Sequence, residues 1–190
     1  MSDMQKVPFP QRKKNRLDSY DYSSCGTYFI TVCTAGRRNL FWESIPEIVG
    51  ATIGRPQDIE LSKYGKIVDA AIKNISAVYP AIAIDSYVIM PNHIHLLLRI
   101  CADESGRPMV APTVSQVVNQ LKGYVSKKAG ETVWQKSFHD HVIRGREDYD
   151  EIAKYIYENP MRWQYDVLYA EEQERGRCTP TSFLLILTYP

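Results

Sequence analysis

All four histidines of the chain lie in two His-x-His pairs, His93/His95 and His139/His141. In a β-strand, residues i and i+2 project from the same face, so each pair can present two imidazoles to one point. Two neutral imidazoles can bind a divalent metal ion and leave positions open for a third ligand, water or a phosphate oxygen. The first pair is the stronger candidate, because residues 94–98 are otherwise apolar and unsatisfied imidazoles are costly to bury there. The second pair lies in a more polar stretch, where exposed histidines without a ligand are common.

A second group of candidate residues, Tyr155 and Asn159, lies about 60 residues further along the chain. In a helix these two side chains are one turn apart on the same face, at the margin of the apolar stripe. Tyrosine has a pKa near 10, so as a nucleophile it needs a base, or a metal ion that polarises the electrophile. Taken alone, the pair also describes a half-buried tyrosine followed by an asparagine that ends a helix before Pro160.

The surrounding sequence predicts the elements that position these residues. Strands are predicted where β-branched and aromatic residues run between turn signals: residues 26–34, 81–90, 93–100 and 138–144. Helices are predicted where apolar residues recur at helical spacing: residues 62–78, 114–129 and 146–159, with Ser62 and Thr113 as N-caps. This order predicts an α+β fold in which helices pack on one face of an antiparallel sheet.

The composition is that of a globular protein. The chain has 190 residues, of which 44% are hydrophobic, and a formal net charge of +1. Any contact with nucleic acid must therefore come from local clusters of basic residues. No apolar run approaches the roughly 20 residues of a membrane span, and the four cysteines lack a CxxC spacing. We expect a cytoplasmic protein that does not contact a membrane.

Basic residues are locally clustered, although the net charge of the chain is close to zero. Residues 1–20 read as a basic N-terminal arm, and the 13 tyrosines of the chain supply rings on which unpaired bases can stack. The candidate phosphate contacts are Arg12, Lys13, Lys14 and Arg16 in the arm, Arg37 and Arg38 after the first strand, and Lys122 in the second helix. For the arm, a solvated terminus without a ligand is an equally good interpretation.

Together the motifs resemble a known family. The segment Pro91-Asn92-His93-Ile94-His95-Leu96, followed by Tyr155-Ile156-x-x-Asn159-Pro160, is similar to the motif pair of the HUH single-strand transposases that use one tyrosine. The closer match is to the REP-associated tyrosine transposases. Flanking blocks extend the similarity over residues 12–168, among them Val133-Trp134-Gln135 and His141-Val142-Ile143-Arg144.

This resemblance implies a ferredoxin-like (RRM-like) sheet with the histidine pair on a central strand and the tyrosine on a helix opposite. It implies that His93, His95 and Asn159 bind Mg²⁺ or Mn²⁺, with Asn159 at the position where better-studied relatives have glutamine. Tyr155 would be the nucleophile. The implied reaction is transesterification of single-stranded hairpin DNA through a 5′-phosphotyrosine intermediate, as in DNA transposition and recombination.

The resemblance also implies a division of the chain. Residues 21–168 would form the catalytic domain, between the basic arm and a C-terminal extension at 169–190, and the protein would act as a monomer or a homodimer. One alternative is a non-catalytic hairpin-binding module derived from a transposase. Another is a zinc hydrolase that uses all four histidines, although the chain lacks an H-E-x-x-H pattern and a nearby cysteine ligand.

Overall fold

The computed structural model describes residues 22, 24–44, 59–101, 112–166 and 168. The strands are β1 (Gly26–Cys33), β2 (Ile82–Ile89), β3 (His93–Ile100) and β4 (His139–Val142). The helices are α1 (Lys63–Lys73), α2 (Ile75–Val78), α3 (Val114–Ala129) and α4 (Arg146–Glu158), with the 3-10 helices η1 (Ala35–Arg37) and η3 (Asn159–Tyr165). The predicted arm at 1–20 and extension at 169–190 lie outside the described residues.

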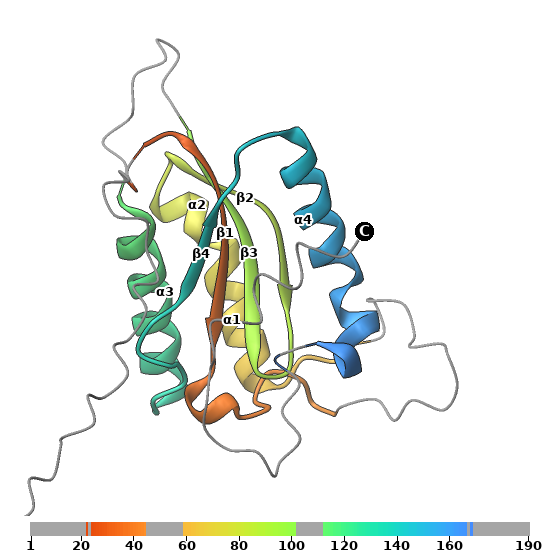
Figure 1. Cartoon of the computed structure of the whole chain (residues 1–190). Helices are drawn as coiled ribbons and strands as arrows, with labels where there is room; N and C mark the ends of the chain where they lie inside the picture. The colour runs from red at the N-terminus through yellow and green to blue at the C-terminus, as the bar shows by residue number, and fades with distance from the viewer. Residues whose placement is uncertain (1–21, 23, 45–58, 102–111, 167, 169–190) are drawn as a thin grey trace, which may run out of the picture.

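The four strands form one antiparallel sheet in the order β2-β3-β1-β4 (Figure 1). All four predicted strands are present, and the last is shorter than the predicted 138–144. The central strands are β3 and β1, and β3 carries the first histidine pair. Their register places Thr31 opposite His95 and Cys33 opposite His93. The α+β fold with a ferredoxin-like strand order is thereby confirmed.

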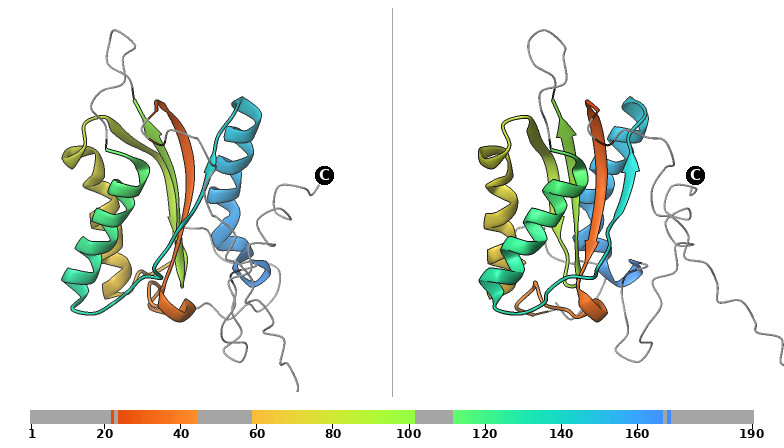
Figure 2. Two further views of the ribbon diagram at one scale, coloured as in Figure 1. Left: turned by 60° about the vertical axis from the view of Figure 1, so that its left-hand side comes forward. Right: turned by 90° about the vertical axis from the view of Figure 1, so that its left-hand side faces the viewer.

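Helices cover both faces of this sheet (Figure 2). The first three helices lie against one face, as predicted, whereas α4 lies against the opposite face. The expectation that the helices pack on one face is therefore wrong for α4. The reason lies in β3, where every residue except Arg99 is buried. A strand buried on both faces needs a covering layer on each side.

Alternate side chains of the central strands divide between the two layers. A large core lies between the sheet and the first three helices, and includes Tyr28, Ile30 and Leu96. The cluster beneath α4 is smaller and consists of Phe29, Leu97, Ile152 and Ile156. His93 and His95 share the parity of Leu97 along β3, so both imidazoles face the α4 layer.

The predicted N-caps are confirmed. The side-chain oxygen of Ser62 accepts hydrogen bonds from the backbone N–H groups of Tyr64 and Gly65 at the start of α1. Thr113 begins α3 in a capping box with Gln116. In both cases the cap supplies acceptors for N–H groups that have no partner within the helix.

Two predicted helices differ in extent from the observed ones. The helix predicted over 62–78 is divided at Asn74, which separates α1 from α2. The helix predicted to stop before Pro160 ends as an α-helix at Glu158 but continues as η3. Proline is tolerated there because the first turn of a helix needs no backbone donor at that position. This continuation carries the chain to Asp166.

Among the described residues, no helix is long and apolar enough to cross a membrane.

The buried glycine of α1 allows this helix to pack closely on the chain before it. A Cβ atom at Gly65 would lie 2.2 Å from the carbonyl oxygen of Phe41, whereas a Cβ at Gly123 of α3 would meet nothing within 4 Å. We predict that Gly65→Ala lowers the free energy of unfolding by about 2 kcal/mol or more. Gly123→Ala should raise it by up to about 1 kcal/mol. Urea denaturation measures both, and similar effects of the two substitutions would contradict this packing.

Candidate metal centre and active site

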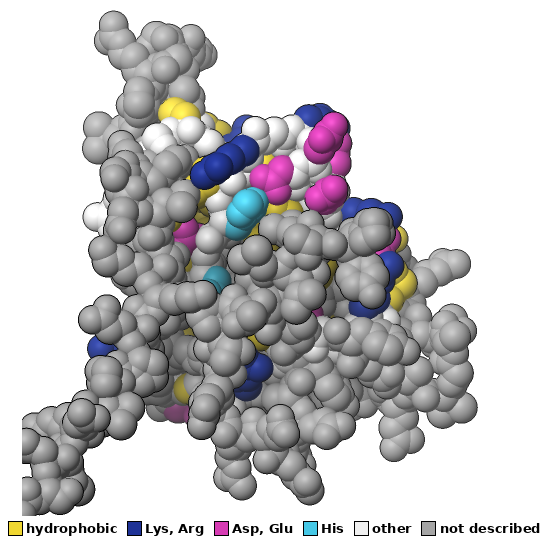
Figure 3. Space-filling view, viewed as in Figure 1, with side chains coloured by type: hydrophobic (Ala, Val, Ile, Leu, Met, Phe, Trp, Pro, Cys, Tyr) yellow, Lys and Arg dark blue, Asp and Glu magenta, His cyan; other side chains and the backbone are white. Residues whose placement is uncertain are grey.

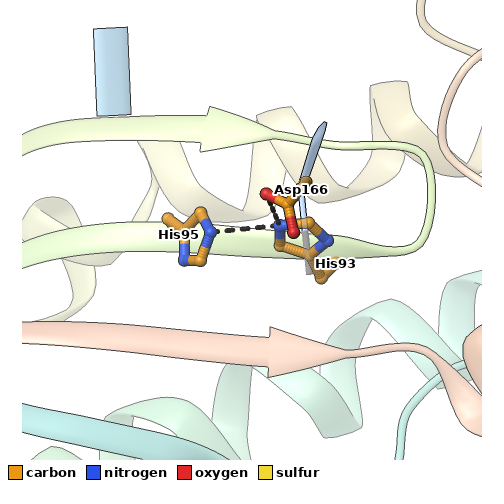
Figure 4. A group of neighbouring side chains, drawn as sticks. All are labelled: His93, His95 and Asp166. Carbon is orange, nitrogen blue, oxygen red and sulfur yellow. Dashed lines mark hydrogen bonds and ion pairs between the residues drawn. The ribbon is translucent and has the colours of Figure 1, made fainter. Parts of the chain in front are cut away.

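Two imidazoles and a carboxylate meet on the α4 side of the sheet (Figure 4). The Nε2 atoms of His93 and His95 lie 3.0 Å apart. Asp166, which directly follows η3, places Oδ2 4.0 Å from Nε2 of His93. The three ligand atoms all lie within 4.8 Å of one another. Sequence analysis identified the two histidines but missed Asp166.

Hydrogen bonds on the far side of each ring orient the imidazoles. Nδ1 of His93 lies 2.8 Å from Oδ1 of Asn92, whose Nδ2 donates to the carbonyl of Leu168. Because Oδ1 of Asn92 is an acceptor, Nδ1 of His93 carries the proton and its Nε2 has a free lone pair. Nδ1 of His95 lies 2.8 Å from Oγ1 of Thr31 in the neighbouring strand. Such outer partners fix the orientation of metal-binding histidines.

Burial keeps both histidines neutral. It lowers the pKa of His93 to about 3, and the positive charge of Arg37 adds to this effect. Burial also lowers the pKa of His95 well below its ordinary range, assisted by His93 and opposed by Asp166. Neutral imidazole is the form that binds a metal ion. The pair is therefore ready to act as ligand at neutral pH.

The donor arrangement fits a shared divalent ion. Adjacent ligands about 2.1 Å from an octahedral ion lie about 3.0 Å apart, which is the distance between Nε2 of His93 and Nε2 of His95. Two nitrogen lone pairs that face each other at this distance repel unless they share a proton or a cation. Imidazole and carboxylate donors are compatible with several first-row divalent metals as well as with Mg²⁺.

Tyr155 of α4 faces the histidine pair. Its Oη lies 3.4 Å from Nε2 of His95 and 3.4 Å from Oδ2 of Asp166. Its ring packs edge-on against Phe29, with 6.1 Å between the ring centroids. Burial, and then the charge of Asp166, raises the pKa of Tyr155 above its ordinary value. The phenol is therefore protonated at neutral pH and lies beside two proton acceptors.

The side chain of Asn159 is buried next to this group. Neither its amide nitrogen nor its amide oxygen has a hydrogen-bond partner among the described residues, although its amide opposes the rise in the pKa of Tyr155. At most this amide contacts the phenol of Tyr155, so most of its hydrogen-bonding capacity is unused. This unused capacity is a second observation that fits an additional ligand at the site.

The second histidine pair lies outside this group. Nε2 of His141 lies 3.0 Å from a carboxylate oxygen of Asp148, which also accepts the N–H of Arg144. Figure 3 shows a surface histidine beside acidic side chains on this side of the molecule. These contacts join β4 to α4. Within the described part of the chain, neither His139 nor His141 joins the three ligand atoms, so a zinc centre of four histidines is not assembled.

Three of the predicted phosphate contacts can be placed. Arg38 donates to Glu131 and to the carbonyl of Thr132, and Lys122 donates to the carbonyls of Gln135 and Lys136. Both side chains therefore hold parts of the chain together. Arg37 acts on the pKa of His93 and so belongs to the region of the site. The other four, Arg12, Lys13, Lys14 and Arg16, lie outside the described residues.

The hydroxyl of Thr31 provides a test of ligand orientation. Thr31→Val keeps the shape of the side chain but removes the partner of Nδ1 of His95. We predict that Mn²⁺ binding by the full chain weakens about 10- to 100-fold, as expected for loss of an outer partner. Isothermal titration calorimetry measures the affinity. Thr27→Val, four residues earlier on the same strand, is the matched control, and equal affinities of the two variants would contradict this role of Thr31.

Comparison with known proteins finds two relatives by sequence. No family model matches it. An uncharacterised protein of Haemophilus influenzae is 31% identical over 179 residues, which cover 84% of this chain and 94% of that protein. A second protein of the same organism, named as a candidate REP-associated tyrosine transposase, is 24% identical over 153 residues, or 76% of each chain.

A solved structure shares the fold. It is a REP-associated tyrosine transposase bound to a REP hairpin, with a TM-score of 0.52 and 22% identity over 74% of this chain and 70% of that one. The resemblance drawn from the histidine and tyrosine motifs is thereby confirmed. The chain belongs to one family with the 31% identical Haemophilus influenzae protein, and it resembles the REP-associated tyrosine transposases in both sequence and fold.

Proposed function

We propose that this protein is a metal-dependent endonuclease and strand transferase that acts on single-stranded hairpin DNA. The observation that carries the proposal is the position of Tyr155, whose Oη lies 3.4 Å from Nε2 of His95 in the buried histidine pair. A nucleophile beside an ion-binding pair suits the transesterification of a phosphodiester. The relatives support a transposase-like function, and one of them is bound to a REP hairpin.

The histidine pair forms the proposed metal-binding part of the site. His93, His95 and Asn159 would hold a Mg²⁺ or Mn²⁺ ion, which when bound polarises the scissile phosphate and stabilises the charge of the transition state. Thr31 and Asn92 fix the two imidazoles from behind. The central strand β3 therefore holds the residues that would bind the ion and orient the phosphate, and they are in position before any DNA is bound.

Tyr155 supplies the other half. Its Oη attacks the phosphorus atom and loses its proton as the new bond forms. Because the lone pair on Nε2 of His95 would be bound to the ion, the nearest acceptor that keeps an unused lone pair is Oδ2 of the Asp166 carboxylate, 3.4 Å from Oη. The bond from phosphorus to the 3′ oxygen breaks, and that oxygen takes up one proton, in balance with the proton lost by Tyr155, and leaves as a 3′-hydroxyl. The 5′-phosphotyrosine keeps a phosphodiester bond, so a later 3′-hydroxyl can reverse the step without a nucleotide cofactor.

Loss of the phenolic oxygen tests this chemistry. We expect the wild-type chain, with Mn²⁺ and a labelled single-stranded hairpin, to give a covalent protein–DNA band on a denaturing gel. Tyr155→Phe should give none, because the attacking atom is absent, while it still binds the hairpin. The control is Tyr157→Phe, two residues along the same helix, where the side chain is 68% exposed and the band should persist.

Two results would overturn the proposal. A covalent band from Tyr155→Phe would assign the attack to another residue. Tight hairpin binding by the wild type without a band, across several hairpins and metal ions, would instead identify a hairpin-binding module that does not cut DNA.

Arg37 is the basic residue that we assign to DNA at this site. It ends η1, which is separated by Thr34 alone from Cys33, the last residue of β1 and the one opposite His93. Thr34 joins this turn to the start of β3, because its N–H donates to the carbonyl of Asn92. Arg37 has a φ of +55°, a left-handed conformation that costs energy for residues other than glycine. Such strain at a site border supports a role in binding.

Replacement of Arg37 tests whether it contributes to hairpin binding without being needed for folding. We predict that Arg37→Gly weakens hairpin binding about tenfold and makes its salt dependence shallower by about one phosphate contact. The variant should still unfold cooperatively in urea, because glycine adopts the left-handed conformation without strain. Lys66→Gln, on α1 across the sheet, removes one charge as the control. If both variants bind DNA equally, Arg37 does not contact it.

A further inference from the structure

We propose that Asp166 is a ligand of the metal ion at the histidine pair, a carboxylate that the histidine and tyrosine motifs do not contain. The inference rests on the proposed function only in taking His93 and His95 as a metal site. It adds an anionic donor to a set that, by the family resemblance, consists of two imidazoles and an amide.

The position of the carboxylate is that of a ligand. The side chain of Asp166 is 3% exposed, and its Oδ2 lies 4.0 Å from Nε2 of His93. The same oxygen lies 3.4 Å from Oη of Tyr155. Figure 4 shows the carboxylate pointing at the two imidazoles rather than away from them. Oδ2 therefore lies where the two Nε2 atoms and the phenol converge.

A chain of hydrogen bonds holds Asp166 in this place. Its other oxygen, Oδ1, accepts the N–H of Leu168 at 2.7 Å. The carbonyl of Leu168 accepts Nδ2 of Asn92 at 2.9 Å, and Oδ1 of Asn92 accepts the Nδ1 proton of His93. The segment after η3 is thus connected through Asn92 to the back of a histidine that faces Asp166. With Oδ1 engaged, Oδ2 is the oxygen left for the site.

A bound metal ion would offset the cost of burying the Asp166 carboxylate. Among the residues that the structure describes, the basic side chain that Oδ2 of Asp166 approaches is the imidazole of His93, at 4.0 Å. A buried carboxylate is costly unless it is paired or bound to a metal ion. A divalent ion held by neutral donors alone would bring a charge of about +2 into the interior, and one carboxylate reduces this to about +1. Carboxylate oxygen is also the donor that Mg²⁺ and Mn²⁺ favour.

Metal affinity measured without DNA tests the inference. Mn²⁺ is titrated into the full chain by isothermal titration calorimetry, with wild type, Asp166→Asn and Asp148→Asn compared. Asparagine keeps Oδ1 as the acceptor for Leu168 but removes the charge, so Asp166→Asn should fold and yet bind Mn²⁺ at least tenfold more weakly. Asp148→Asn is the control, because its carboxylate binds His141 instead, and its affinity should match the wild type.

The outcomes separate this inference from the proposed function. Wild-type affinity in Asp166→Asn overturns the role of Asp166, even if the covalent DNA band forms as expected. Weakened Mn²⁺ binding supports it, even if no DNA is ever cut. If Asp166→Asn fails to fold, Asp166→Glu replaces it as the test. That variant keeps the charge but displaces the carboxylate by one methylene group, so it should bind Mn²⁺ measurably and more weakly than the wild type. Wild-type affinity in a folded Asp166→Glu chain would contradict a ligand role.

Discussion

The structure depends on two neutral imidazoles buried side by side on the central strand of the sheet. Nε2 of His93 and Nε2 of His95 face each other at 3.0 Å, an arrangement that is unfavourable unless a proton or a cation lies between them. Thr31 and Asn92 stabilise it from behind, and α4 covers it from the front. Thr31 and Asn92 orient the two rings, and α4 shields them from water.

Much of the site could be predicted because its signals are local. Alternation along a strand places His93 and His95 on one face, and helical spacing places Tyr155 one turn from Asn159. Their convergence came only through resemblance to a family, since no local pattern brings residues 60 positions apart together. The apolar run on both faces of β3 was a sign that two layers are needed. That run bears on the cost of burying the histidines, but it does not by itself indicate which helix covers the second face.

Asp166 could not be predicted for a physical reason. It follows η3, a 3-10 segment that continues beyond Pro160, where helical periodicity no longer indicates which way a side chain points. Its orientation comes from long-range hydrogen bonds through Leu168 and Asn92. Tertiary contacts of this kind leave no pattern in the neighbouring sequence, and a lone aspartate after a helix is ordinary on a protein surface.

The uneven packing of the two layers has a consequence for motion. The face under α1 and α3 holds the large core. Between α4 and the sheet lies a smaller cluster of four buried apolar residues, two of them from α4, with partly buried side chains around it and polar contacts such as that between His141 and Asp148. Local opening follows the number of buried contacts that must be broken, so α4 separates from the sheet at a lower free-energy cost than global unfolding. Tyr155, the proposed nucleophile, thus lies on the layer with the smaller core, and the histidines lie on the central strand. If Tyr155 acts as proposed, an attached DNA strand would move with α4, while the histidine face stays in place to receive the next 3′ end.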